Sequence, residues 1–205
     1  MRGGPAAWNT LARRLREGKP FHSAADSPGM PEQLRWGQEK EEQGVDQFWL
    51  RHPEYHIGNP GFSAYGDDPD HPMYSLAGVS VDRILRIRGV DEFPTPSGIL
   101  ELKCPYDPNV HLGYSLGGKV PDEHICQLRW GMHVWEAKFG IFASFNARDD
   151  DPDTNYVEFH VKHDEAFEAK MLEKLDIFLT GYQSGTEFTT EMLTPKTASN
   201  LRSMF

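Results

Sequence analysis

A Glu-x-Lys pair interrupts the apolar run GILELKCPYDP at residues 98–108. The two charged residues, Glu101 and Lys103, alternate with leucines, so an extended chain directs both charges to one face and Leu100 and Leu102 to the other. A charge that is buried without a partner costs several kcal/mol. The pair therefore needs a partner that makes a charged face on this strand favourable.

Asp82 is the nearest candidate for that partner, because it lies in the preceding strand candidate, YSLAGVSVDRILRI at 74–87. The connector GVDEFPTPSG holds the glycines and prolines of a turn, which favours a hairpin. Asp82 and Glu101 would then approach each other, and two carboxylates at one point repel unless a cation lies between them. Oxygen ligands favour Mg²⁺ or Mn²⁺, and the backbone carbonyl of Leu102 can complete the ligand set. With Lys103 to orient or deprotonate a water, the pattern is suited to hydrolysing a phosphodiester.

The same residues also fit a purely structural interpretation. Asp82 and Glu101 would then form surface ion pairs with Arg83 or Arg86, and Lys103 would be an exposed cross-strand partner. Spacing alone leaves both interpretations open, since an Asp on one strand and Glu-x-Lys on the next is a common combination.

The composition indicates a compact protein and excludes some classes of site. The chain has 205 residues, 38% of them hydrophobic, which is enough for one sizeable core. Its two cysteines, Cys104 and Cys126, are too few to hold an iron–sulfur cluster, and we expect them to be buried thiols. No apolar run approaches the roughly 20 residues of a membrane span, and no signal-peptide pattern opens the chain. We therefore expect a cytoplasmic protein without a membrane partner.

The net charge of −10 argues against a protein that coats nucleic acid. Basic residues nevertheless cluster near the start and around residues 83–88, whereas acidic residues concentrate at 39–42, 67–70 and 149–153. This distribution is compatible with a basic groove in an acidic body.

Hydrophobic periodicity predicts the elements that would position these residues. It indicates one domain over residues 1–205 of α/β (α+β) class, with a central mixed sheet flanked by helices. Residues 1–30 would hold an N-terminal helix and a loop, and residues 186–205 an extended tail. Helices are expected at 8–18, 31–51, 122–138 and 164–185, and strands near 56 and at 74–87, 98–104, 140–147 and 156–162.

Further strings accompany the Asp…Glu-x-Lys combination in a consistent order between Trp8 and Phe145. Together they resemble the phage lambda exonuclease (YqaJ-like) family of the PD-(D/E)XK nuclease superfamily, which implies a restriction-endonuclease-like core. Val81 and Arg83 replace a proline and a glycine of that family's segment, and its Gln-x-Gln is here Gln127-Leu128-Arg129. The strings are REGKPFHS at 16–23, WGQEKEE at 36–42, SVDRI at 80–84, LELKCP at 100–105, and LGG at 116–118 followed by HICQLRWGM at 124–132.

The resemblance implies roles for individual residues. Asp82, Glu101 and the carbonyl of Leu102 would bind the metal, and Lys103 would position the attacking water. Glu41 would be a ligand of a second metal or of water, and Gln127 would hold the water or a ligand. Arg16 and Ser23 would bind the terminal 5′-phosphate, and Ser80 and Arg129 are further phosphate contacts. The alternatives are a surface or capping role for Glu41, a buried structural amide for Gln127, and a solvated helix face for Arg16.

The function implied is a Mg²⁺-dependent (or Mn²⁺-dependent) deoxyribonuclease with two ions. It would degrade the 5′-ended strand of double-stranded DNA from its end to 5′-mononucleotides, in phage DNA recombination. The family also implies a homotrimer ring around DNA and a single-strand annealing protein as partner. Three alternatives stay open: a structure-specific or nicking endonuclease on the same core, a non-catalytic DNA-end-binding protein, and an acidic interaction protein that mimics DNA.

Overall fold

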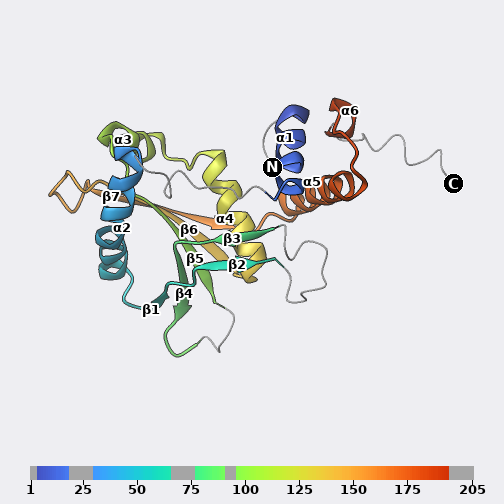
Figure 1. The fold of residues 1–205 in the computed structure, drawn as a ribbon. Coiled ribbons are helices and arrows are strands. Elements are labelled where there is room, and N and C mark those ends of the chain that lie inside the picture. The colour runs from blue at the N-terminus through green and yellow to red at the C-terminus, as the bar shows by residue number, and fades with distance from the viewer. Residues whose placement is uncertain (1–3, 19–29, 66–76, 91–95, 194–205) are drawn as a thin grey trace. The chain divides into compact units, whose positions relative to one another are not determined.

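The computed structural model describes residues 4–18, 30–65, 77–90 and 96–193 (Figure 1). Two compact units make up the chain, one of residues 1–21 and 165–205 and the other of residues 22–164. One nuclease domain over residues 1–205 stays a prediction.

The second unit is built on a five-stranded sheet with the order β1-β4-β5-β6-β7. The pair β5–β6 is parallel and the other three pairs are antiparallel. The predicted central mixed sheet is thus confirmed, and so is the hairpin that joins β4 to β5. The strands are β1 (Tyr55–Gly58), β4 (Arg83–Ile87), β5 (Gly98–Lys103), β6 (Phe139–Phe145) and β7 (Tyr156–Lys162), and a separate pair is formed by β2 (Phe62–Ala64) and β3 (Gly78–Ser80).

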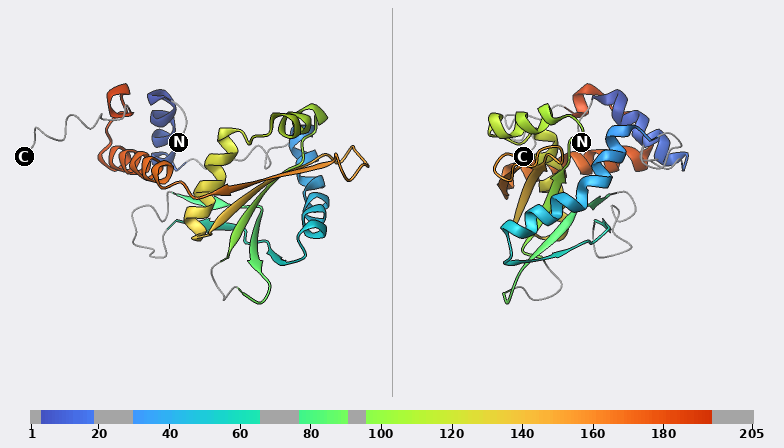
Figure 2. Two further views of the ribbon diagram at one scale, coloured as in Figure 1. Left: turned by 180° about the vertical axis from the view of Figure 1, so that it is seen from behind. Right: turned by 90° about the vertical axis from the view of Figure 1, so that its left-hand side faces the viewer.

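Helices cover both faces of this sheet (Figures 1 and 2). Helix α4 (Asp122–Trp135) lies in the crossover between β5 and β6, which a parallel pair requires, and packs on one face. Helix α2 (Glu32–Arg51), predicted at 31–51, packs on the other face. No helix among the described residues combines the length and apolarity that a membrane crossing needs.

Strand β5 sends alternate side chains into two different hydrophobic clusters. Leu100 and Leu102 pack with Val45 and Phe48 of α2, whereas Ile99 packs toward α4. The prediction that the leucines anchor this strand in the core is therefore confirmed, and Glu101 and Lys103 face the side of α4.

Two glycines allow the helices to approach the sheet this closely. A Cβ at Gly44 of α2 would lie 2.7 Å from Cδ2 of Leu102, and one at Gly131 of α4 would lie 2.7 Å from Cδ1 of Ile99. Gly131, which is unfavourable for a helix by propensity, is thus explained by packing against β5.

The segment predicted as one strand at 74–87 is broken in the structure. Strand β3 ends at Ser80 and pairs with β2, while β4 begins at Arg83 and pairs with β1 and β5. Residues 81 and 82 form the bend between the two strands. Asp82 therefore lies at a bend and not within a strand, which frees its side chain to turn toward β5.

Helix α3 (Pro108–Gly117) was not predicted, because its asparagine, proline and glycines were interpreted as turns. The carboxylate of Asp107 caps the helix by accepting a hydrogen bond from the backbone N–H of Asn109 at 2.9 Å, and Pro108 occupies the first helical position. Gly118, with φ of 61°, ends it in the left-handed conformation. An aspartate cap followed by proline was the signal that could have identified this helix.

The described residues of the first unit form three helices: α1 (Pro5–Arg16), α5 (Glu165–Ser184) and α6 (Thr190–Leu193). Trp8 of α1, Phe178 of α5 and Phe188 form its core, with ring centroids 5.3–5.8 Å apart. The segment predicted as an extended tail from residue 186 thus begins with a buried phenylalanine and a short helix. Residues 194–205 lie outside the described residues.

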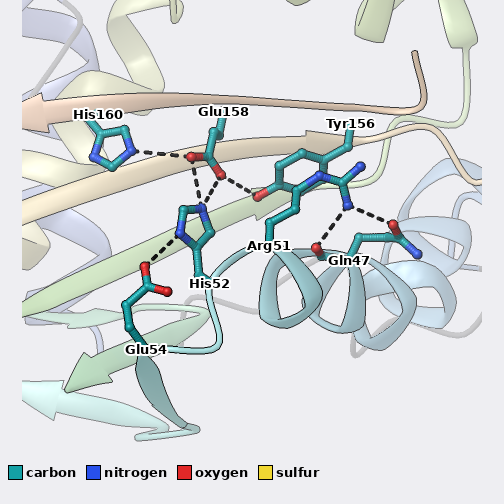
Figure 3. Close-up of polar contacts among 7 residues, drawn as sticks. All are labelled: Gln47, Arg51, His52, Glu54, Tyr156, Glu158 and His160. Carbon is teal, nitrogen blue, oxygen red and sulfur yellow. Dashed lines mark hydrogen bonds and ion pairs between the residues drawn. The ribbon is translucent and has the colours of Figure 1, made fainter. Parts of the chain in front are cut away.

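A polar cluster centred on His52 connects the end of α2 to β7 (Figure 3). His52 Nδ1 lies 3.0 Å from the carboxylate of Glu54, and Nε2 lies 2.9 Å from that of Glu158. Burial lowers the pKa of His52, but the hydrogen bonds and charges of Glu158 and Glu54 outweigh burial and leave this pKa raised. When it is protonated, His52 holds the two carboxylates together, and Tyr156 also donates to Glu158 at 3.0 Å.

Candidate active site

Asp82 is held against β5 by a backbone hydrogen bond. The register of the β4–β5 ladder ends with the pair Arg83 and Leu100, so the N–H of Leu102 has no partner on β4. The Asp82 carboxylate oxygen Oδ2 accepts a hydrogen bond from this N–H at 2.7 Å. The length of the hairpin therefore does not separate Asp82 from Glu101 and Lys103, and the structure brings the three residues together.

Glu101 is a carboxylate in an unfavourable position. Only 2% of the residue is exposed. Burial raises the pKa of Glu101 to about 7, and the negative charge of Asp82 adds to the rise, while Lys103 and a hydrogen bond from Gln127 oppose it. Gln127 of α4 makes this hydrogen bond to Glu101, and its role in holding the water or a ligand stays a prediction.

Lys103 forms an ion pair with the Glu101 carboxylate. Burial lowers the pKa of Lys103, but the charges of Glu101 and Asp82 and the hydrogen bond to Glu101 outweigh burial, so the pKa is raised. At neutral pH the side chain is therefore an ammonium group. Its single positive charge faces the carboxyl groups of both Glu101 and Asp82.

The residues at this point fit a hard divalent cation. Burial and then the negative charge of Asp82 raise the pKa of Glu101, and such a cation would offset both effects. Across the described ranges, no three His, Cys, Asp or Glu side chains gather as a metal cluster. The ligand set would thus consist of the two carboxylates, the Leu102 carbonyl and oxygens from water or phosphate, which is the environment that Mg²⁺ prefers.

Arg83 connects α2 to the bend that carries Asp82. Its buried guanidinium donates to the carboxylates of Glu41 at 2.7 Å and Glu42 at 2.5 Å and to the backbone carbonyl of Asp82 at 2.5 Å. Arg83 therefore pairs with α2 and not, as the structural interpretation had it, with Asp82 or Glu101. No role at the site was predicted for Arg83, although its place in a glycine position of the family segment was a signal.

A pocket of about 880 Å³ opens over this region and is lined by Glu41, Asp82 and Lys103, among others. Glu41 thus lies at the pocket, paired with Arg83, and its role as a ligand stays a prediction. The pocket also contains His124 of α4, which sequence analysis treated as ordinary. Burial and the charge of Lys103 lower the pKa of His124, so its imidazole is neutral at pH 7.

Three of the four predicted phosphate contacts, Arg16, Ser80 and Arg129, lie among the described residues. In the first unit, Arg16 donates to the carbonyls of Tyr182 at 3.0 Å and Gly181 at 3.1 Å. In the second unit, Arg129 forms an ion pair with Asp164 at 3.0 Å, and Ser80 is exposed at the end of β3. Ser23 lies outside the described residues. The phosphate roles of these four residues stay predictions.

Cys104 is a free, buried thiol, and burial raises its pKa to about 12, so it is unreactive. Cys126 is also free but only partly buried. The expectation of a buried thiol thus holds for Cys104 alone.

The chain is similar in sequence to one known protein family. The sequence model of the YqaJ-like viral recombinase domain family matches residues 9–138, more than half of the chain. No curated protein sequence matches the chain with significance.

Solved structures share the fold at low sequence identity. The alkaline exonuclease LHK-Exo of Laribacter hongkongensis aligns with a TM-score of 0.69 and 18% identity, over 90% of this chain and 84% of that one. The same enzyme in complex with dAMP aligns with a TM-score of 0.64 and 19% identity, over 86% and 77% of the two chains. A phage-related exonuclease from Haemophilus somnus aligns with a TM-score of 0.50 and 12% identity, over 88% and 79%. The predicted restriction-endonuclease-like core is confirmed by this shared fold.

Proposed function

Because the chain belongs to the YqaJ-like viral recombinase domain family, we propose that it is a divalent-metal-dependent deoxyribonuclease. It acts as an exonuclease on double-stranded DNA ends, degrading the 5′-ended strand to 5′-mononucleotides during recombination. The observation that carries the proposal is the meeting of Asp82, Glu101 and Lys103 beside one pocket.

Asp82, Glu101 and the Leu102 carbonyl are the proposed metal ligands, and Glu41 is the proposed ligand of a second ion or of water. Mg²⁺ or Mn²⁺, as two ions, supplies Lewis-acid stabilisation of the charge that develops on the phosphate oxygens. The site favours such a cation because burial, and then the negative charge of Asp82, destabilise the ionised form of Glu101.

The residues around the carboxylates position the reactants. Lys103, protonated at neutral pH, donates hydrogen bonds to the attacking water and to a phosphate oxygen, and its charge stabilises the transition state. Gln127 and Lys103 hold the Glu101 carboxylate in one orientation. Arg83 holds Glu41 and the backbone of Asp82 in place from the opposite side.

The substrate and partners follow from the family. Double-stranded DNA ends are the proposed substrate, and a homotrimer ring and a single-strand annealing protein are the proposed assembly and partner, in the cytoplasm of the host cell. The dAMP bound by the alkaline exonuclease of similar fold is a deoxynucleoside monophosphate, the class of product proposed here. A ring would also accommodate the net charge of −10, because only its inner channel need be basic.

Cleavage assays test the proposal on three substrates: linear duplex with 5′-phosphate ends, linear duplex with 5′-hydroxyl ends, and covalently closed circles. With Mg²⁺ we expect mononucleotide release from the linear duplexes, none from the circles, and none by Glu101→Ala. Cleavage of closed circles would show an endonuclease on the same core. Absence of Mg²⁺-dependent cleavage from every substrate would leave a DNA-binding protein and reject the enzyme.

A further inference from the structure

Arg148 is a second positively charged residue, besides Lys103, that lines the pocket of the candidate active site. Arg148 follows β6 in the loop to β7, and its guanidinium carbon lies 4.4 Å from the ring centroid of Trp36 and 4.6 Å from that of Tyr106. Trp36 belongs to α2, and Tyr106 follows β5. The two rings meet edge to face with centroids 5.8 Å apart, so three segments distant in the sequence form one cluster, Trp36–Tyr106–Arg148.

No acidic side chain forms an ion pair with Arg148 in the part of the chain that the structure describes. The residue is exposed, and its guanidinium contacts the two rings but no carboxylate of the described residues. The carboxylate of the neighbouring Asp149 turns back into its own loop, accepting from the N–H of Asp151 at 3.0 Å and the hydroxyl of Thr154 at 2.8 Å. Arg51 is the contrasting case, since it stacks on Tyr156 at 4.4 Å but also donates to Gln47 and to the carbonyl of Pro152.

The aromatic contacts orient the guanidinium before any ligand arrives. Stacking on two rings restricts the rotamers of a long side chain, so less conformational entropy is lost when its N–H groups bind. Lys40 also lies over Trp36, with Nζ 5.2 Å from the ring centroid. The cluster therefore presents positive charge, and its complementary ligand is a phosphate group.

The position of the cluster indicates which phosphate this is. Arg148 and Tyr106 line the same pocket as Asp82 and Lys103. We propose that Arg148, oriented by Trp36 and Tyr106, binds a backbone phosphate of the DNA strand that enters this pocket, at a linkage other than the one being cleaved. This inference rests on the proposed function, because it takes DNA as the ligand.

Equilibrium binding tests the inference separately from turnover. Fluorescence anisotropy would measure the Kd of a labelled linear duplex for the full chain over a range of salt concentrations, with Ca²⁺ in place of Mg²⁺ to slow cleavage. We expect Arg148→Ala to weaken binding about tenfold for every DNA sequence and to reduce the salt slope by about 1. Arg148→Lys should keep the salt slope but bind more weakly than the wild type, because it loses the bidentate donors.

Lys138→Ala is the matched control. Lys138 is an exposed residue immediately before β6, whereas Arg148 follows the other end of that strand. Lys138→Ala therefore also removes one positive charge, but at a place outside the pocket. We expect its Kd and salt slope to equal those of the wild type. Equal binding by Arg148→Ala and Lys138→Ala would overturn the inference.

Single neutral methylphosphonate linkages, placed in turn along the 5′-ended strand, locate the contact. One linkage other than the scissile one should weaken binding by the wild type but have no further effect on Arg148→Ala. If the neutral linkage weakened DNA binding by the wild type and by Arg148→Ala equally, the inference would be overturned. If the wild type binds in this Arg148-dependent way but cleaves no DNA, the proposed function fails and the phosphate site stands.

Discussion

The buried ion pair between Arg83 and α2 allows a quantitative prediction. The Arg83 side chain is 5% exposed and pairs with Glu41, which is 33% exposed, and Glu42, which is 76% exposed. Arg83→Met keeps the apolar stem and removes the guanidinium. Breaking a fully buried pair costs about 3–5 kcal/mol, whereas an exposed pair contributes about 0–1 kcal/mol.

The partly exposed partners place the expected loss between these limits. Loss of the pair with Glu42 should change the free energy of unfolding little, because Glu42 stays solvated. Glu41 and the Asp82 carbonyl, however, lose a hydrogen-bond donor in a partly enclosed place. We therefore expect Arg83→Met to lower the free energy of unfolding by about 2 kcal/mol. Urea denaturation followed by circular dichroism measures this value.

Two comparisons make the measurement decisive. Arg88→Ala removes an exposed arginine just beyond β4 and should change the free energy of unfolding by less than about 0.5 kcal/mol. In a Glu41→Gln background, the cost of Arg83→Met should fall by about 1 kcal/mol, because the two residues interact directly. A loss as small as that of Arg88→Ala, or no coupling to Glu41, would refute the reasoning.

Three further predictions concern the titratable groups. Lys103→Ala should keep Mn²⁺ and DNA binding but lose turnover, as single-turnover assays would show; retained turnover would remove Lys103 from the mechanism. The pKa of Glu101 is raised to about 7, so the metal-free protein should lose about 3 kcal/mol of stability as the pH rises from about 4.5 through 7. Urea titrations should show this loss absent from Glu101→Gln, and an identical pH profile for both proteins would contradict it. The raised pKa of His52 makes stability change with pH in the same direction. Its ion pairs with Glu54 and Glu158 stabilise the folded protein fully below about pH 6.5 and less as the pH rises through the raised pKa. The stability difference between wild type and His52→Gln should therefore shrink from pH 6 to pH 9, and a constant difference would exclude the charged pair.

Local patterns in the sequence predicted much of the fold and of the candidate site. The alternation in β5 identified both its buried face and its charged face, and the turn residues at 89–98 identified the hairpin. These features depend on residues near one another in the chain. For the same reason Asp82, one hairpin away, could be placed beside Glu101.

Features that depend on distant contacts were not predictable in this way. The structural interpretation paired Arg83 with Asp82 or Glu101, but its partners lie about forty positions earlier on α2. The Trp36–Tyr106–Arg148 cluster joins a helix, a strand end and a loop. No periodicity links such segments, so only the folded chain brings them together.

The proposed nuclease activity depends most directly on the carboxylate of Glu101. The deciding measurement is the rate at which wild type and Glu101→Gln release mononucleotides from a 5′-phosphorylated linear duplex in Mg²⁺. The substitution keeps the shape of the side chain and removes its charge, so we predict a loss of about a thousandfold or more at unchanged DNA affinity. A variant that retains more than about a tenth of the wild-type rate would contradict the assignment of this pocket as a metal-dependent nuclease site.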